Sequence, residues 1–170
     1  PICEHSLKNK IKNITIPLLE ESDIHNKDTR KIFSRMIKNY ANNYPQLTFS
    51  FEAEISPKEV LDIIKLSKNF FITYDTGNIA SCGLNPSDYI SSLHKYINNV
   101  HLKDKSISKE SVYPGLGNVD FKLIFNLLRS FNYDGMYTIQ TKRGETGKEQ
   151  ETISNHKQFF EGVCNEQESI

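Results

Sequence analysis

Hydrophobic and polar positions alternate in several short stretches of this chain, and each stretch is followed by a longer amphipathic segment. Four of the alternating stretches cover residues 47–52, 70–75, 97–101 and 135–140. Because successive side chains of a strand point to opposite faces, one face of each stretch is apolar and the other carries smaller polar residues. The segments between them have the spacing of apolar residues that is typical of helices. The pattern predicts β-strands alternating with α-helices.

A fifth strand is predicted at residues 13–19, and several helix ends are marked by their side chains. Asp28 is expected to cap the first long helix. Ser56 is expected to cap the next helix, with Pro57 in its first turn and Glu59 completing a capping box. The predicted helices cover residues 28–44, 56–67, 86–96 and 120–128 and end with one that runs to residue 163, a glycine-rich turn follows residue 75, and longer loops cover residues 105–118 and 142–148.

Five βα units in a row predict parallel strands joined by right-handed crossovers. Five units cannot close a (β/α)8 barrel, which typically needs about 250 residues. The chain is therefore either an open sheet or the last five units of a barrel. The polar inner face favours the barrel, because both faces of a doubly wound open sheet are usually apolar. We expect one α/β domain at residues 1–163, an incomplete TIM-type barrel, followed by a tail at residues 164–170.

Composition restricts the partners of this domain. The chain has 170 residues, a formal net charge of zero and 37% hydrophobic residues, which fits a single globular domain. Zero net charge gives no electrostatic reason to expect nucleic acid or a membrane surface as a partner. No apolar run approaches the roughly 20 residues of a membrane span. Cys3, Cys82 and Cys164 lack metal-binding spacing, so reduced thiols and a cytoplasmic location are predicted.

The four polar strand ends predict a metal site. The side chains that end the four stretches are Glu52, Asp75, His101 and Gln140, and the carboxyl ends of parallel strands meet at one edge of a sheet. The residues expected on the same inner face are Thr48, Ser50, Thr73, Asn99 and Thr138. Oxygen ligands with one imidazole suit Mn²⁺, Mg²⁺ or Co²⁺, and Zn²⁺ also accepts them. As an alternative, Asp75 only caps the turn that follows it.

Further residues near the strand ends are candidates for substrate binding. Lys103, Asn78 and Arg143 are expected to contact the substrate, Arg143 through a phosphate group. Asp104 lies on the opposite face from Lys103 and is expected to orient a neighbour. Glu54 competes with Glu52 as the functional acid but lies beyond the strand. The remaining histidines, expected at the surface, are His5, His25, His94 and His156.

Four motifs, taken in order, resemble the xylose isomerase-like TIM barrels, the superfamily of sugar-phosphate isomerases and epimerases and of AP endonucleases. The motifs are Phe51-Glu52, Tyr74-Asp75-Thr76-Gly77-Asn78, Val100-His101-Leu102-Lys103-Asp104, and Pro114-Gly115-Leu116-Gly117-Asn118-Val119-Asp120-Phe121. The resemblance covers residues 13–163 and implies that the strands are the fourth to eighth of the family barrel. The family usually has Glu where this chain has Gln140, which cannot act as a base.

The resemblance implies a metal-dependent sugar or sugar-phosphate isomerase or epimerase. Such an enzyme removes a proton next to a metal-polarised carbonyl and forms an ene-diolate. Glu52 would be both ligand and base, and another group would supply the second acid or base. The implied partner is a small sugar or sugar phosphate, and a homo-oligomer is compatible with the family. The open alternatives are a keto-inositol dehydratase, an AP-endonuclease-like phosphodiesterase with further His and Glu ligands, and a fragment or degenerate barrel without activity of its own.

Overall fold

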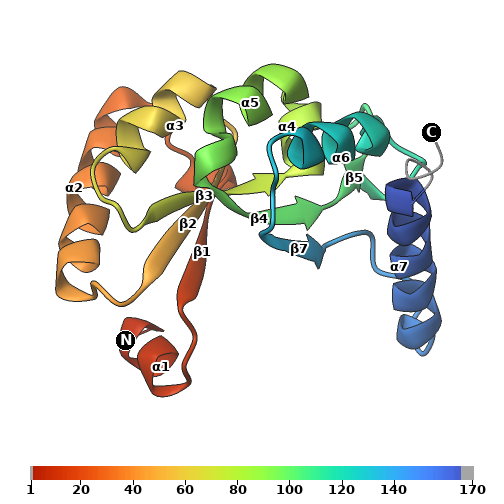
Figure 1. Cartoon of the computed structure of the whole chain (residues 1–170), viewed down its shortest axis with the longest axis horizontal. Helices are drawn as coiled ribbons and strands as arrows, with labels where there is room; N and C mark the ends of the chain where they lie inside the picture. The colour runs from red at the N-terminus through yellow and green to blue at the C-terminus, as the bar shows by residue number, and fades with distance from the viewer. Residues whose placement is uncertain (1, 166–170) are drawn as a thin grey trace. The chain divides into compact units, whose positions relative to one another are not determined.

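The computed structural model describes residues 2–165, which form two compact units: unit 1 (residues 2–74 and 95–99) and unit 2 (residues 75–94 and 100–165). Five parallel strands form one sheet with the hydrogen-bonding order β1-β2-β3-β4-β7 (Figure 1). The strands are β1 (Asn13–Leu18), β2 (Thr48–Ala53), β3 (Phe70–Asp75), β4 (Ile97–Leu102) and β7 (Met136–Ile139). The predicted sheet of five parallel strands is confirmed.

Unit 1 is built on β1, β2 and β3 with their helices. Its helices are α1 (Ile2–Lys8), the 3-10 turn η1 (Glu20–Ser22), α2 (Lys27–Asn43) and α3 (Pro57–Ile64). The β1–β2 register pairs Asn13 with Thr48, and each later pair follows in step. Aromatic rings fill the space between α2 and the sheet: Phe33 of α2 meets Phe51 of β2 edge-on at 5.5 Å between ring centroids. This buried aromatic contact fixes the helix against the strand that carries Glu52.

The helix caps of unit 1 confirm one prediction and correct another. Ser56 and Glu59 form the predicted capping box at the start of α3. The cap of α2 is Asn26, whose side chain accepts hydrogen bonds from the N–H groups of Asp28 and Thr29. The prediction of Asp28 as the cap was therefore wrong by two residues. Asn and Asp are equally good caps, so the residue types alone could not distinguish the two positions.

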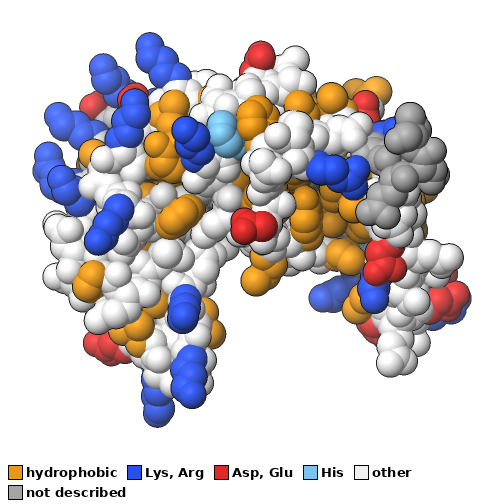
Figure 2. Space-filling view, viewed as in Figure 1, with side chains coloured by type: hydrophobic (Ala, Val, Ile, Leu, Met, Phe, Trp, Pro, Cys, Tyr) orange, Lys and Arg blue, Asp and Glu red, His pale blue; other side chains and the backbone are white. Residues whose placement is uncertain are grey.

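Lys and Arg side chains gather over α2 and α3 (Figure 2). The two helices lie side by side (Figure 1), and Arg30 of α2 pairs with Glu59 of α3 at 2.5 Å. Hydrogen bonds from Arg30, and then from Ser56, lower the pKa of Glu59 below its ordinary value of 4.5. The basic side chains of this surface are thus partly matched by acidic ones.

Polar side chains gather at the start of the strands in unit 1. The amide oxygen of Asn13 accepts hydrogen bonds from the side chains of Thr48 at 2.8 Å, Ser50 at 2.9 Å and Asn98 at 3.0 Å. The predicted polar inner face is thereby confirmed for Thr48 and Ser50. Asn98 joins them, and Asn99, which the alternation pattern places on this face, is also buried. The start of β4 therefore departs from strict alternation.

Unit 2 contains more local structure than the sequence pattern predicted. Its helices and short strands are α4 (Thr76–Ser81), α5 (Pro86–Leu93), β5 (Asp104–Lys105), β6 (Ser111–Val112), α6 (Phe121–Ser130) and α7 (Glu149–Asn165), and the turn η2 (His94–Tyr96) precedes β4. The glycine-rich turn expected after residue 75 is the helix α4. The loop expected at residues 105–118 contains the antiparallel pair β5–β6. Elements of two to six residues are too short to show a period.

The core of unit 2 includes the amphipathic helix that the sequence predicted. Asp120 caps α6 by accepting the N–H of Leu123 at 2.9 Å. The buried residues of α6 are Phe121, Ile124, Phe125 and Leu128. Phe160 of α7 packs against Phe121, with 5.1 Å between ring centroids. The helix α7 continues to residue 165, and residues 166–170 of the expected tail lie outside the described part of the chain. Among the described residues, no helix combines the length and hydropathy needed to cross a membrane.

Candidate metal centre

Asp75 and His101 form a buried pair in unit 2. Asp75 is the last residue of β3 and is 1% exposed, and His101 of β4 is 8% exposed. His101 Nδ1 and Asp75 Oδ2 lie 4.0 Å apart. This distance is too long for a hydrogen bond. It does not exceed the sum of two metal–ligand bonds of about 2.0–2.2 Å each. One divalent cation can therefore contact both atoms.

The two carboxylate oxygens of Asp75 have different neighbours. Oδ1 accepts the N–H of Asn78 at 2.7 Å and so caps α4, while Oδ2 faces His101. A cap at this position was the alternative to a metal ligand, and the two roles use different oxygens. The cap bond also fixes the rotamer of Asp75, which favours a constant position for Oδ2.

Glu52 of unit 1 lies in β2, one residue before the strand ends. Glu52 is 5% exposed. The residue before it, Phe51, pairs with Ile72 of β3. Glu52 is thus buried within unit 1, as Asp75 and His101 are within unit 2. Two carboxylates and an imidazole are a donor set that Mn²⁺ and Zn²⁺ accept. A buried carboxylate is costly unless positive charge is near, and a bound divalent cation would supply it.

Lys103 and Asn78 lie close along the chain to His101 and Asp75, and each has a backbone group bound by a side chain of unit 2. Asn78 is buried within α4. The backbone of Lys103 is bound on both sides by Thr76: its N–H donates to Thr76 Oγ1 at 2.9 Å, and its C=O accepts from the same hydroxyl at 2.5 Å. The Lys103 stem passes over Gly77, where an added Cβ would come within 3.1 Å of Lys103 Cγ.

Asp104 organises the loop that precedes α6. Its carboxylate is fully buried and accepts three backbone N–H groups, from Gly115 at 2.9 Å, Gly117 at 2.9 Å and Val119 at 3.2 Å. A Cβ at Gly117 would clash with this carboxylate. Asp104 therefore orients a neighbouring loop, as expected from its place opposite Lys103, and glycine is required where the loop passes over it.

Gln140 and Arg143 come together in unit 2, in an open pocket of about 320 Å³. The backbone N–H of Gln140 donates to the C=O of Leu102 at 3.0 Å, which places Gln140 beside the end of β4. The side chains of both Gln140 and Arg143 are exposed. Their roles as fourth ligand and phosphate-binding residue stay predictions.

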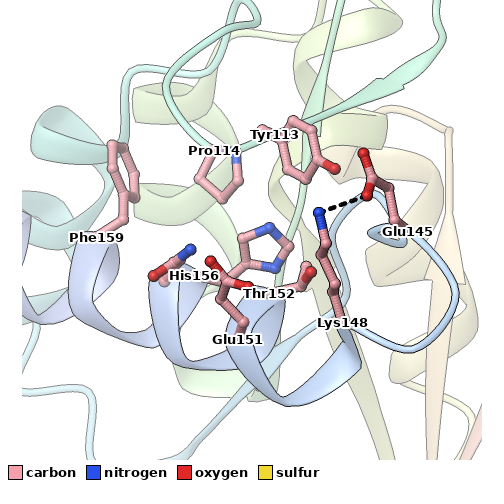
Figure 3. A pocket seen from close by; sticks show the side chains of 9 residues that line it. Tyr113, Pro114, Glu145, Lys148, Glu151, Thr152, His156 and Phe159 are labelled. Carbon is pink, nitrogen blue, oxygen red and sulfur yellow. Dashed lines mark ion pairs between the residues drawn. The ribbon is translucent and has the colours of Figure 1, made fainter.

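His156 was expected at the surface, and this prediction was wrong. It is 6% exposed on α7, and its ring is hydrogen-bonded to the hydroxyl of Thr141. Burial lowers its pKa below the ordinary 6.5. Its position four residues before the buried Phe160 places both on one helix face, a signal that the sequence contained. Figure 3 shows His156 in a pocket of about 440 Å³ lined by Tyr113, Pro114, Glu145, Lys148, Glu151, Thr152, Asn155, His156 and Phe159.

Comparison with known proteins identifies relatives of the chain. A family model for the xylose isomerase-like TIM barrel matches residues 36–161. An uncharacterized protein of Methanocaldococcus jannaschii is 29% identical over 123 residues, which cover 68% of this chain and 42% of the relative. The inosose dehydratase of Clostridium tetani is 26% identical over 169 residues, covering 82% of this chain and 55% of the relative. The chain thus spans about half the length of these curated relatives.

Solved structures share the fold. The crystal structure of the IolI protein with a bound zinc atom has a TM-score of 0.79 and 18% identity, with 99% of this chain and 68% of that chain covered. The apo structure of the 3-keto-D-glucoside 4-epimerase of E. coli has a TM-score of 0.73 and 17% identity, with 95% of this chain and 68% of that chain covered. The uncovered third of each neighbour agrees with the predicted incomplete barrel.

Proposed function

The chain belongs to the xylose isomerase-like TIM barrel family, and on this premise we propose a metal-dependent enzyme that removes a proton next to the carbonyl of a sugar or sugar phosphate. The reaction that we favour for this enzyme is isomerisation or epimerisation of the substrate. The observation that carries the proposal is the buried Asp75–His101 pair, with 4.0 Å between His101 Nδ1 and Asp75 Oδ2.

The proposed ligands are Glu52, Asp75 and His101, with the amide oxygen of Gln140 as the fourth. Support comes from the donor set, from the burial of the first three residues and from the backbone bond that places Gln140 beside β4. A fold neighbour that binds a zinc atom agrees with a divalent cation. Mn²⁺, Mg²⁺, Co²⁺ and Zn²⁺ are all compatible with these ligands.

The residues around this centre divide the chemical work. Glu52, Asp75, His101 and Gln140 would hold a divalent cation, which would supply polarisation of the substrate carbonyl and so make the neighbouring C–H bond more acidic. Glu52 takes the proton from that carbon, leaving the electron pair in the new C=C bond of the ene-diolate. Lys103 and Asn78 are proposed to hold substrate hydroxyls, and Arg143 a phosphate group. Gln140 cannot take up a proton, so a different group must return one in an epimerase.

Dehydration is the second candidate, because the curated relatives of the chain include inosose dehydratases. It starts with the same proton removal. The electron pair of the broken C–H bond then expels the hydroxyl on the adjacent carbon, which leaves as water after an acid protonates it. This route needs no base on the opposite face of the substrate, and so it accommodates Gln140 directly.

The test is solvent exchange in D₂O with Mn²⁺-loaded protein and a panel of ketoses, ketose phosphates and keto-inositols, read by mass spectrometry. A product with the elemental formula of the substrate and with incorporated deuterium would support isomerisation or epimerisation. A product that has lost one water molecule would support dehydration. Glu52→Gln, assayed at a Mn²⁺ concentration that keeps it loaded, should lose exchange, whereas Glu54→Gln should retain it. Loaded wild-type protein that neither exchanges nor dehydrates any substrate would contradict the proposal and favour a chain without activity of its own.

A further inference from the structure

A single buried hydroxyl joins the segments that carry Asp75 and His101. Thr76 is fully buried and directly follows Asp75 as the first residue of α4. Its Oγ1 accepts the N–H of Lys103 at 2.9 Å and donates to the C=O of the same residue at 2.5 Å. One side chain therefore satisfies both backbone groups of a residue 27 positions further along the chain.

The hydroxyl acts where the regular strand pairing has ended. The strand β3 ends at Asp75 and β4 ends at Leu102, so Thr76 and Lys103 lie one residue beyond their strands. The backbone of Thr76 is part of the helix α4 and no longer continues the strand. The Thr76 hydroxyl forms the two hydrogen bonds to Lys103 instead. The backbones are also close at the next residue, since a Cβ on Gly77 would come within 3.1 Å of Lys103 O.

We propose that Thr76 is a positioning residue that sets the separation of Asp75 and His101. This inference rests on the proposed function, because it concerns two ligands of the proposed metal centre. Asp75 is covalently adjacent to Thr76, and His101 precedes Lys103 by two residues. Holding Lys103 against Thr76 therefore holds both ligands. Contacts behind the ligands of a metal commonly change affinity 10- to 100-fold when they are lost.

The test compares three variants by Mn²⁺ calorimetry and by the visible spectrum of bound Co²⁺, which reports ligand geometry. Thr76→Val removes the hydroxyl with little change of shape and should lower the affinity by about 10- to 100-fold and alter the spectrum. Thr76→Ser keeps the hydroxyl and should behave as the wild type. Thr48→Val is the matched control, because the Thr48 hydroxyl also donates to a backbone carbonyl, that of Lys12 at 3.2 Å. It lies at the other end of β2 from Glu52 and should leave both readouts unchanged.

Gly77→Ala tests the same contact if Thr76→Val does not fold. It keeps the hydroxyl but requires Lys103 to shift by a few tenths of an ångström, and it should also weaken binding. A folded Thr76→Val or Gly77→Ala protein with wild-type affinity and spectrum would overturn the inference. Wild-type protein that binds no Mn²⁺ would refute the proposed function and the inference with it, so the two failures are distinguishable.

Discussion

Replacing Asp104 by Asn removes one charge from the buried contact that shapes the loop before α6. The wild-type carboxylate accepts the N–H groups of Gly115, Gly117 and Val119. In the variant, the single amide oxygen can keep the two bonds that Oδ2 accepts, whereas the NH₂ group faces the N–H of Val119. Two donors then oppose each other, and one buried N–H loses its acceptor.

The size of the effect follows from those three bonds. A hydrogen bond to a charged group contributes about 1.5–3 kcal/mol, and a neutral acceptor gives about half as much. Loss of one bond and weakening of two therefore costs about 3–6 kcal/mol. Removing a buried charge recovers part of this, which leaves a net destabilisation of about 2–3 kcal/mol. For a chain of this length the melting temperature should fall by roughly 4–12 °C.

Urea unfolding followed by circular dichroism measures this change. Asp104→Asn should lower the urea midpoint with an unchanged slope. Asp134→Asn makes the same chemical change at an exposed residue and should stay within about 0.5 kcal/mol of the wild type. Equal midpoints for Asp104→Asn and the wild type would refute the reasoning, because they would mean that the carboxylate contributes nothing to the loop.

Three further results are expected from stability measurements. Ser56→Ala removes the capping box of α3 and should cost about 1 kcal/mol in urea unfolding; no change would contradict the role of the cap. Because the pKa of Glu59 is lowered in the folded state, its contact with Arg30 stabilises the fold above about pH 4.5. This contribution is lost as the pH falls through the folded-state pKa. The difference in unfolding free energy between the wild type and Glu59→Gln should therefore shrink below pH 4.5. The lowered pKa of His156 means that unfolding takes up a proton below pH 6.5, so stability should decline as the pH falls from 6.5, and His156→Gln should decline less over the same range.

Much of the fold could be predicted from the sequence because the strands and longer helices show their period over many residues. The strand at residues 70–75 and the caps Ser56 and Asp120 were predicted correctly. The pair β5–β6 could not be predicted, since each strand has two residues. Asn26 and Asp28 are both suitable caps, and the choice between them depends on where the backbone turns.

For the candidate site, the approach of Asp75 to His101 could be predicted from their places near strand ends, but the contacts behind them could not. Asp75 and His101 were expected together and lie 4.0 Å apart. The bond of Thr76 to Lys103 joins residues 27 positions apart and exists only once the two strands are in place. Burial of His156 depends likewise on how α7 packs, although its spacing from Phe160 indicated an inward face.

Calorimetric titration of Mn²⁺ into the wild type and into Asp75→Asn and His101→Ala tests the metal centre most directly. His25→Ala, which removes an exposed imidazole, is the control. The proposed centre predicts that the wild type and the control each bind one ion per chain. In Asp75→Asn and His101→Ala the affinity should be lost or should fall by more than about 10- to 100-fold, the loss that is typical when only a residue supporting a ligand is changed. Folded wild-type protein that binds no Mn²⁺, Co²⁺ or Zn²⁺, or ligand variants that bind as the wild type does, would contradict it.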